Sequence, residues 1–231
     1  PVVSGVIATV FEMNQIETFL MQGCFMLLSI IIPIVYVCKR KVYANEIGLR
    51  KTEPGSLRET LLFIPLILSE LPLMLVGVDF KSFTYVSVLA FFTLMVGISE
   101  ELYFRGIILK LLKDNYSVTQ TIVISALVFG IGHIAGILAG KSIVEVLLQI
   151  INAIVFGILA AEIVILTKSL FPVIIWHFLF DFVNHISLAT STSQYIAIGF
   201  QEIIMIIYAL YLWSKVSVGN IQIIRDVSNK L

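Results

Sequence analysis

Three short motifs that contain charged or imidazole side chains stand out in a chain that is otherwise strongly apolar. Their members, in chain order, are Glu100, Glu101 and Arg105, then Phe129 and His133, then His177 and Asp181. A charged side chain at the centre of a bilayer costs about 2.5–3.5 kcal/mol by insertion measurements. Carboxylates and imidazoles are the groups that carry out general acid–base chemistry. Their presence in three separate apolar segments therefore predicts that they act together as one site.

The spacing of the first group gives its two glutamates different roles. Residues four apart share a helix face, so Glu101 and Arg105 are expected to form a structural ion pair. A buried carboxylate needs a partner of this kind. Glu100 is turned by about 100° around the helix and can face another neighbour. We therefore predict that Glu100 is a general base acting on water, while Glu101 and Arg105 support the site.

The two histidine groups supply the rest of the predicted site. His177 and Asp181 also lie four residues apart, and they could bind a metal ion or polarise a substrate carbonyl. His133 lies in a glycine-rich stretch, and small residues allow helices to approach closely. We predict that His133, His177 and Asp181 act with Glu100 as catalytic residues.

Composition indicates a membrane protein. The chain has 231 residues, of which 59% are hydrophobic and 13% are charged, and its mean hydropathy is +1.03. Soluble domains carry about 25% charged residues. We predict one membrane-embedded domain over residues 1–231. The formal net charge is zero, which gives no electrostatic basis for binding nucleic acid.

Apolar periodicity predicts an all-α, polytopic bundle of about 7–8 transmembrane helices. The first 18 residues are expected to form an interfacial or re-entrant piece. At 1.5 Å per residue, the site residues lie roughly 9–21 Å above the cytoplasmic helix ends, which is one broad layer. The expected segments cover about residues 19–38, 57–78, 82–112, 119–138, 143–167, 171–188 and 195–213.

Loop charges predict the orientation of the bundle. Placing the first loop inside leaves only Lys81 and Lys141 outside. We therefore expect a cytoplasmic C-terminus and a polar cavity that opens to the cytoplasm. The inside loops and tail then carry twelve cations, which are Lys39, Arg40, Lys41, Arg50, Lys51, Arg58, Lys110, Lys113, Lys168, Lys215, Arg225 and Lys230.

The three groups together resemble the motifs of the CAAX prenyl protease and bacteriocin-processing family, also called the Abi family. The resemblance covers about residues 95–185, in the order Glu100-Glu101-Leu-Tyr-Phe-Arg105, Phe129-Gly-Ile-Gly-His133 and His177-Phe-Leu-Phe-Asp181. It implies a multi-pass intramembrane endopeptidase that needs no metal cofactor and sits in a bacterial cell membrane. Its expected partners are a peptide or membrane-protein substrate and the lipid bilayer.

The resemblance also implies a role for each site residue. Glu100 would activate the attacking water, His133 would help to hold it, and His177 with the fourth motif residue would stabilise the oxyanion. That fourth residue is Asp181, where the prenyl-protein proteases more often carry Asn. An ionised Asp cannot donate a hydrogen bond. Asp181 must therefore be protonated, orient His177 or bind a metal.

Three other functions fit the same residues. The first is a zinc-dependent membrane protease with the metal held by His133, His177 and Asp181. The second is a non-catalytic bacteriocin-immunity or scaffold protein that works by binding. The third is a proton-coupled transporter that uses the buried acids, although the chain lacks the internal repeat that many transporters show.

Overall fold

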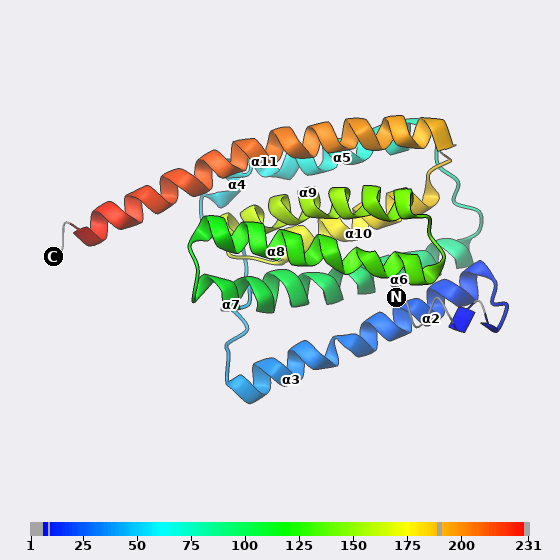
Figure 1. Ribbon diagram of the computed structural model, residues 1–231, viewed down its shortest axis with the longest axis horizontal. Helices are drawn as coiled ribbons and strands as arrows, with labels where there is room; N and C mark the ends of the chain where they lie inside the picture. Colours follow the sequence, from blue (N-terminus) through cyan, green and yellow to red (C-terminus); the bar gives the residue numbers. More distant parts are fainter. Residues whose placement is uncertain (1–6, 9, 189–190, 229–231) are drawn as a thin grey trace.

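Helices account for most of the described chain, as a computed structural model of residues 7–8, 10–188 and 191–228 shows (Figure 1). A single bridge between Val78 and Ser187 is the strand-like pairing found there. The main helices are α2 (Gln15–Ser29), α3 (Ile31–Arg40), α4 (Ser56–Glu59), α5 (Ile64–Leu75), α6 (Phe83–Glu101), α7 (Leu109–Lys113), α8 (Val118–Gly132), α9 (Ile143–Thr167), α10 (Phe171–Ile186) and α11 (Ser191–Ser228).

Five helical stretches are long and apolar enough to cross a membrane. They are Gln15–Arg40, Phe83–Lys113, Val118–Leu138, Ile143–Thr167 and Thr192–Ser217. Two shorter apolar helices, Leu61–Leu75 and Phe171–Ile186, complete the bundle. The polytopic helical fold is therefore confirmed. The expected piece over the first 18 residues lies partly outside the described residues.

Short polar residues fix where the long helices begin. Ser117 and Gln120 form a capping box at the start of α8, and Ser142 and Glu145 form another at the start of α9. In each box the serine oxygen accepts from a free backbone N–H of the first turn, and the Glu or Gln side chain accepts from the serine N–H. Glu145 therefore belongs to a helix start rather than to the buried site.

The helix expected over about 57–78 is shorter in the structure. A 3-10 turn at Leu61–Phe63 precedes α5, and all three of its residues have positive φ, from 49° to 59°. Left-handed backbone interrupts an α-helix, so the chain turns here before α5 begins. Pro65 then lies in the first turn of α5, where its missing N–H leaves no bond unmade.

Two irregular turns occur at the motif residues. A π-helical stretch, Leu102–Ile108, directly follows Glu101, so the stretch expected over about 82–112 is one rod with a local widening. The helix of the second motif changes at His133, where α8 gives way to a 3-10 stretch that runs to Ala139. Such changes of helix type are frequent at functional sites. Periodicity alone gave no sign of either.

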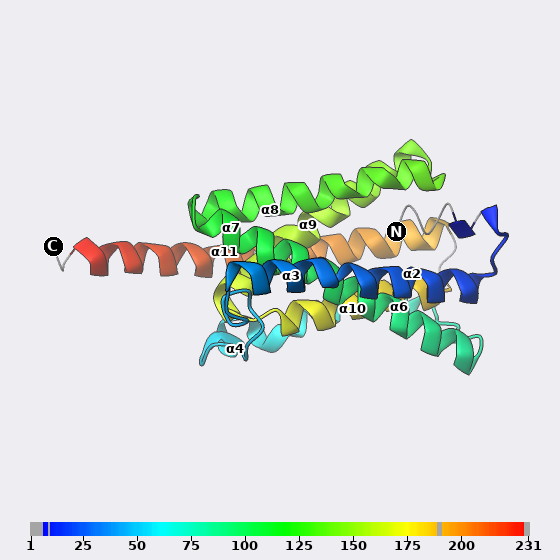
Figure 2. The ribbon, with the colours of Figure 1, turned by 90° about the horizontal axis from the view of Figure 1, so that it is seen from below.

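Helix α9 forms the centre of the bundle. It packs between α8 and α11, while α10 packs against α6 and α5. Figure 1 and Figure 2 show α2 and α3 continuing each other, along the lower edge of the bundle in Figure 1, and α2 packs on α6. Many of the fully buried side chains belong to α9, including Leu159 and Ile163. The stretch 159–164 of α9 is therefore buried on every face, which allows polar groups beside it to be held in place.

Close contact between α8 and α9 depends on two glycines. A Cβ on Gly157 would lie 2.9 Å from the Ala126 Cα, and one on Gly130 would lie 2.4 Å from an Ile154 side-chain carbon. Real Cβ atoms do not approach a backbone carbon so closely. The sequence predicted close helix approach near His133, and the structure places that approach one turn before it, at Gly130.

We expect Gly157→Ala to destabilise the protein by about 1–3 kcal/mol, because the added methyl group must push α8 away from α9. Gly132→Ala is the matched control, since nothing lies within 4 Å of its Cβ position. Thermal unfolding of the detergent-solubilised protein measures both. Equal unfolding temperatures for the two variants would show that the helices are not packed this tightly.

Candidate functional site

The predicted ion pair between Glu101 and Arg105 lies at the centre of the site. Arg105 Nη1 donates to Glu101 Oε1 at 2.9 Å, and both side chains are fully shielded from solvent. The guanidinium also lies 4.2 Å from the centre of the Phe129 ring, in cation–π geometry. The first and second motifs are therefore in direct contact.

Glu101 also holds the third motif. Its Oε1 lies 2.8 Å from His177 Nδ1, from an element 76 residues further along the chain. A carboxylate accepts, so we assign the Nδ1 proton to His177 as the donor. The same oxygen thus joins Arg105 on its own helix and His177 on α10. Sequence spacing predicted the first contact and gave no sign of the second.

The bond at Nδ1 directs the other ring nitrogen towards two further carboxylates. His177 Nε2 lies 3.9 Å from Glu100 Oε2 and 3.7 Å from Asp181 Oδ2. These separations exceed direct hydrogen bonds. They suit groups that contact one small molecule between them. Glu100 and Asp181 keep 20% and 27% of their side chains exposed, while Glu101 keeps none, so the two outer carboxylates are the ones that a ligand can reach.

His133 joins the group through its neighbours. Its Nδ1 lies 3.0 Å from the carbonyl oxygen of Phe129 and donates to it, which leaves Nε2 as an acceptor. The Phe129 ring centre is 5.1 Å from that of His133 and 6.2 Å from that of His177. Glu100 interacts electrostatically with both histidines. The structure thus brings all six predicted site residues into one cluster.

A cavity of about 630 Å³ lies beside this cluster. Phe129, His133, His177 and Asp181 are among its lining residues, which come from α8, α9, α10 and α11. We call it the central cavity. It has both apolar and polar walls, as ligand sites usually do.

The central cavity extends towards one end of the bundle. Its lining includes Lys141 and Glu145 at the start of α9 and Tyr195 near the start of α11. Lys168 lies at the opposite end of α9, and Lys110 and Lys113 lie on α7, just before the start of α8. The lining thus runs to the end that carries the loop before α9, away from the cation-rich end where an opening was expected. Which end faces the cytoplasm stays a prediction from the loop charges.

A second polar network, which motif spacing did not indicate, fixes α10 behind the site. Glu70 of α5 accepts from Trp176 Nε1 at 3.1 Å and from Gln201 Nε2 at 3.2 Å. Trp176 precedes His177 and stacks on Phe156, with ring centres 4.1 Å apart. In the sequence, the only sign of this network is an acidic residue within an apolar segment. The fold is needed to show which residues it contacts.

The arrangement also bears on metal binding. Within the residues that the structure describes, no three His, Cys, Asp or Glu side chains are placed to hold one metal ion. His177 Nδ1 is engaged by Glu101, so Nε2 is the nitrogen that a ligand could use. The predicted zinc set of His133, His177 and Asp181 therefore does not converge as a ligand group.

The sequence is similar to one family of known proteins. Residues 82–183 match the family model described as Rce1-like, type II CAAX prenyl endopeptidase Rce1-like. This match confirms the resemblance to the CAAX prenyl proteases. All three motifs fall within the matched residues. No curated protein and no solved structure matches the chain. With its apolar helices, the match indicates an integral membrane protein and supports CAAX-type protease activity.

The Glu101–Arg105 pair gives a test of the site's framework. We expect Glu101→Leu and Arg105→Met each to destabilise the protein by about 3–5 kcal/mol, because each leaves one buried charge without its partner. The double variant removes both charges and should be more stable than either single variant. Thermal unfolding in detergent measures this cycle. If the loss of stability in the double variant equals the sum of the losses in the two single variants, the two residues do not form a buried pair.

Proposed function

We propose that the protein is an intramembrane endopeptidase that hydrolyses a peptide bond of a hydrophobic or membrane-associated substrate with water activated by Glu100. The observation that carries this proposal is the position of His177 Nε2 between Glu100 and Asp181, at 3.9 Å and 3.7 Å, beside the central cavity. His177 and Asp181 line that cavity, and Glu100, which is not among its lining residues, lies next to them at His177 Nε2. The family match supports the same reaction class.

In this proposal Glu100 takes a proton from water, and the resulting hydroxide attacks the peptide carbonyl carbon. His133 accepts a hydrogen bond from the same water through Nε2, since its Nδ1 donates to Phe129. The C–N bond then breaks, and Glu100 returns the proton to the leaving nitrogen. Exclusion of bulk water by the bundle strengthens each of these interactions.

His177 stabilises the oxyanion from Nε2. Because its Nδ1 proton is held by Glu101, the ring donates from Nε2 only as an imidazolium. Three carboxylates, those of Glu100, Glu101 and Asp181, lie around the ring and balance that charge. In this proposal Asp181 orients His177 and balances its charge. It therefore need not be protonated and need not donate a hydrogen bond itself.

Substrate access follows from the shape of the central cavity. If the cation-rich end faces the cytoplasm, as the loop charges predict, then the C-terminus is cytoplasmic and the cavity extends to the outer end. We therefore propose that the substrate enters from the outer half of the membrane, in place of the expected cytoplasmic entry. The distance of the cut from the substrate's membrane anchor would report the side directly.

We expect Glu100→Gln to reduce cleavage about 10²–10⁴-fold, because the amide cannot accept the proton of water. The comparison is between small membrane proteins and secreted peptides of cells that carry wild-type or variant protein at equal expression. One precursor should accumulate uncut in the variant. Glu17→Gln is the matched control, since Glu17 caps α2 away from the cavity and a glutamine caps equally well.

The same comparison separates the other functions. Retained processing in Glu100→Gln would contradict the proposed base. Matching peptide profiles with a surviving immunity phenotype would favour the binding-only function. Cleavage that stops on metal removal and returns with zinc would favour the metalloprotease.

A further inference from the structure

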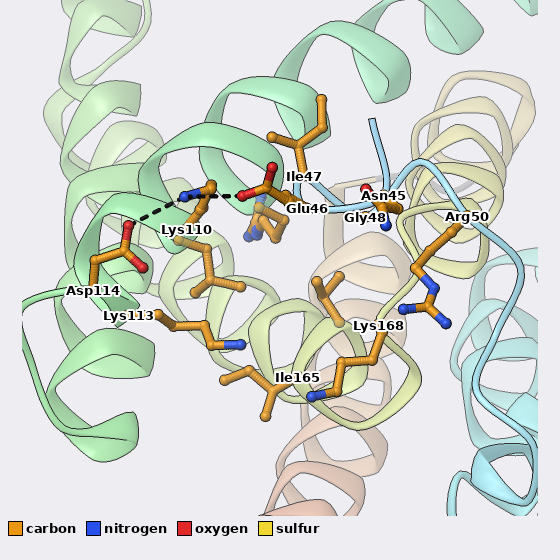
Figure 3. A pocket seen from close by; sticks show the side chains of 13 residues that line it. Asn45, Glu46, Ile47, Gly48, Arg50, Lys110, Lys113, Asp114, Ile165 and Lys168 are labelled. Atoms are coloured by element: carbon orange, nitrogen blue, oxygen red, sulfur yellow. Dashed lines mark hydrogen bonds and ion pairs between the residues drawn. The ribbon is translucent and has the colours of Figure 1, made fainter. Parts of the chain in front are cut away.

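We propose that the pocket at the cation-rich end of the bundle binds the phosphate of an anionic membrane lipid. This pocket, called here the cationic pocket, has a volume of about 290 Å³ and is separate from the central cavity (Figure 3). It lies where α7 and α9 end and where the chain passes through residues 45–50. The inference does not depend on the proposed protease function.

The pocket has an apolar side and a cationic side. Ile47, Leu109, Val164 and Ile165 form apolar lining, and the first three of them are buried. The cations among its lining residues outnumber the acids by five to two, the cations being Arg50, Arg105, Lys110, Lys113 and Lys168, and the acids Glu46 and Asp114. A lipid headgroup joined to acyl chains presents the complementary pair of surfaces, an anion next to hydrocarbon.

Three of the five cations already have partners. Arg105 is paired with Glu101, and Arg50 lies 2.9 Å from Glu53. Lys110 contacts both acids of the pocket, Glu46 at 3.6 Å and Asp114 at 3.2 Å. Lys110 offsets only one of these two acidic charges, and Asp114 also attracts Lys113. Together with Lys113 and Lys168, the group therefore keeps an excess of one positive charge.

The other two cations, Lys113 and Lys168, form no salt bridge with any residue that the structure describes. Figure 3 shows Lys113 reaching in from α7 on one side, with Lys168 on the other. The two ammonium groups repel each other. An anion between them would remove that repulsion and add attraction to both, which is the interaction that the pocket lacks.

The backbone at Lys168 indicates that its position is imposed by the fold. Lys168 ends α9 in the left-handed conformation, with φ of 57°, a position where glycine is usual. Gly48, with φ of 82°, accepts from the backbone N–H of Leu170 and brings the 45–50 loop against this helix end. Lysines at helix C-termini also offset the helix dipole, but that effect alone does not require two of them to meet over one pocket.

The location favours a lipid over a soluble anion. Basic pockets between transmembrane helices at the cytoplasmic side bind anionic headgroups, and each nearby Lys or Arg contributes to the attraction. Loop charges predict that this end faces the cytoplasm. The apolar wall formed by Val164 and Ile165 continues into the membrane-spanning part of α9, where acyl chains would follow the headgroup.

The test is a titration of short-chain phosphatidylglycerol, with phosphatidylcholine as the neutral lipid, into the full chain in neutral detergent micelles. Native mass spectrometry counts the bound lipid. We expect Lys113→Gln with Lys168→Gln to weaken phosphatidylglycerol binding about ten- to thirtyfold. The matched control is Lys39→Gln with Lys41→Gln, which removes two cations at the same end, including another left-handed helix cap, outside the pocket.

The proposal is supported if the wild-type and control proteins bind phosphatidylglycerol in preference to phosphatidylcholine and the pocket variant loses this preference. Equal losses in the control would overturn it, because general surface charge would then explain the binding. Inorganic phosphate is added in a separate arm. If it displaces the lipid completely at similar concentration, the site takes a soluble phosphate and the lipid assignment is wrong.

Discussion

One carboxylate oxygen connects the three motifs. Glu101 Oε1 accepts from Arg105 on its own helix and from His177 on α10, and Arg105 in turn lies over the Phe129 ring of α8. A buried carboxylate with a single cationic partner would fix one helix; this one fixes three. The bond from His177 Nδ1 to this oxygen has the most important consequence, because it determines where Nε2 of the same ring points and which groups Nε2 meets.

The membrane setting divides the molecule into two ends with different chemistry. The central cavity runs from the histidines to the loop before α9, and the cationic pocket lies at the other end, where α7 and α9 finish. Glu101 and Arg105 lie between the two, closed off from solvent, and Arg105 also contributes to the lining of the cationic pocket. A bilayer offers anionic headgroups at its surface and no water in its core. The proposed reaction in the central cavity and the proposed lipid contact in the cationic pocket therefore lie on opposite sides of the Glu101–Arg105 ion pair.

Much of this arrangement could be predicted from the sequence. Apolar runs gave the bundle and nearly all of its helix positions, and four-residue spacing gave the pairs Glu101–Arg105 and His177–Asp181. Contacts between helices were out of reach, because Glu101 and His177 are 76 residues apart and no local pattern relates them. The π-helical stretch after Glu101 and the change of helix at His133 were missed for a related reason, since tertiary packing decides them. The end of the bundle to which the cavity lining runs was not predicted either, because depth along a helix does not show which helices part from one another.

The hydrogen bond between His177 and Glu101 is open to direct measurement. The chain has only three histidines, His133, His177 and His185, so nitrogen NMR of histidine-labelled protein gives a spectrum that single substitutions can assign. We predict that His177 carries a proton on Nδ1, with the chemical shift of a strong bond to a carboxylate, and that Glu101→Leu with Arg105→Met abolishes this signal. A His177 ring protonated on Nε2 alone would contradict the account.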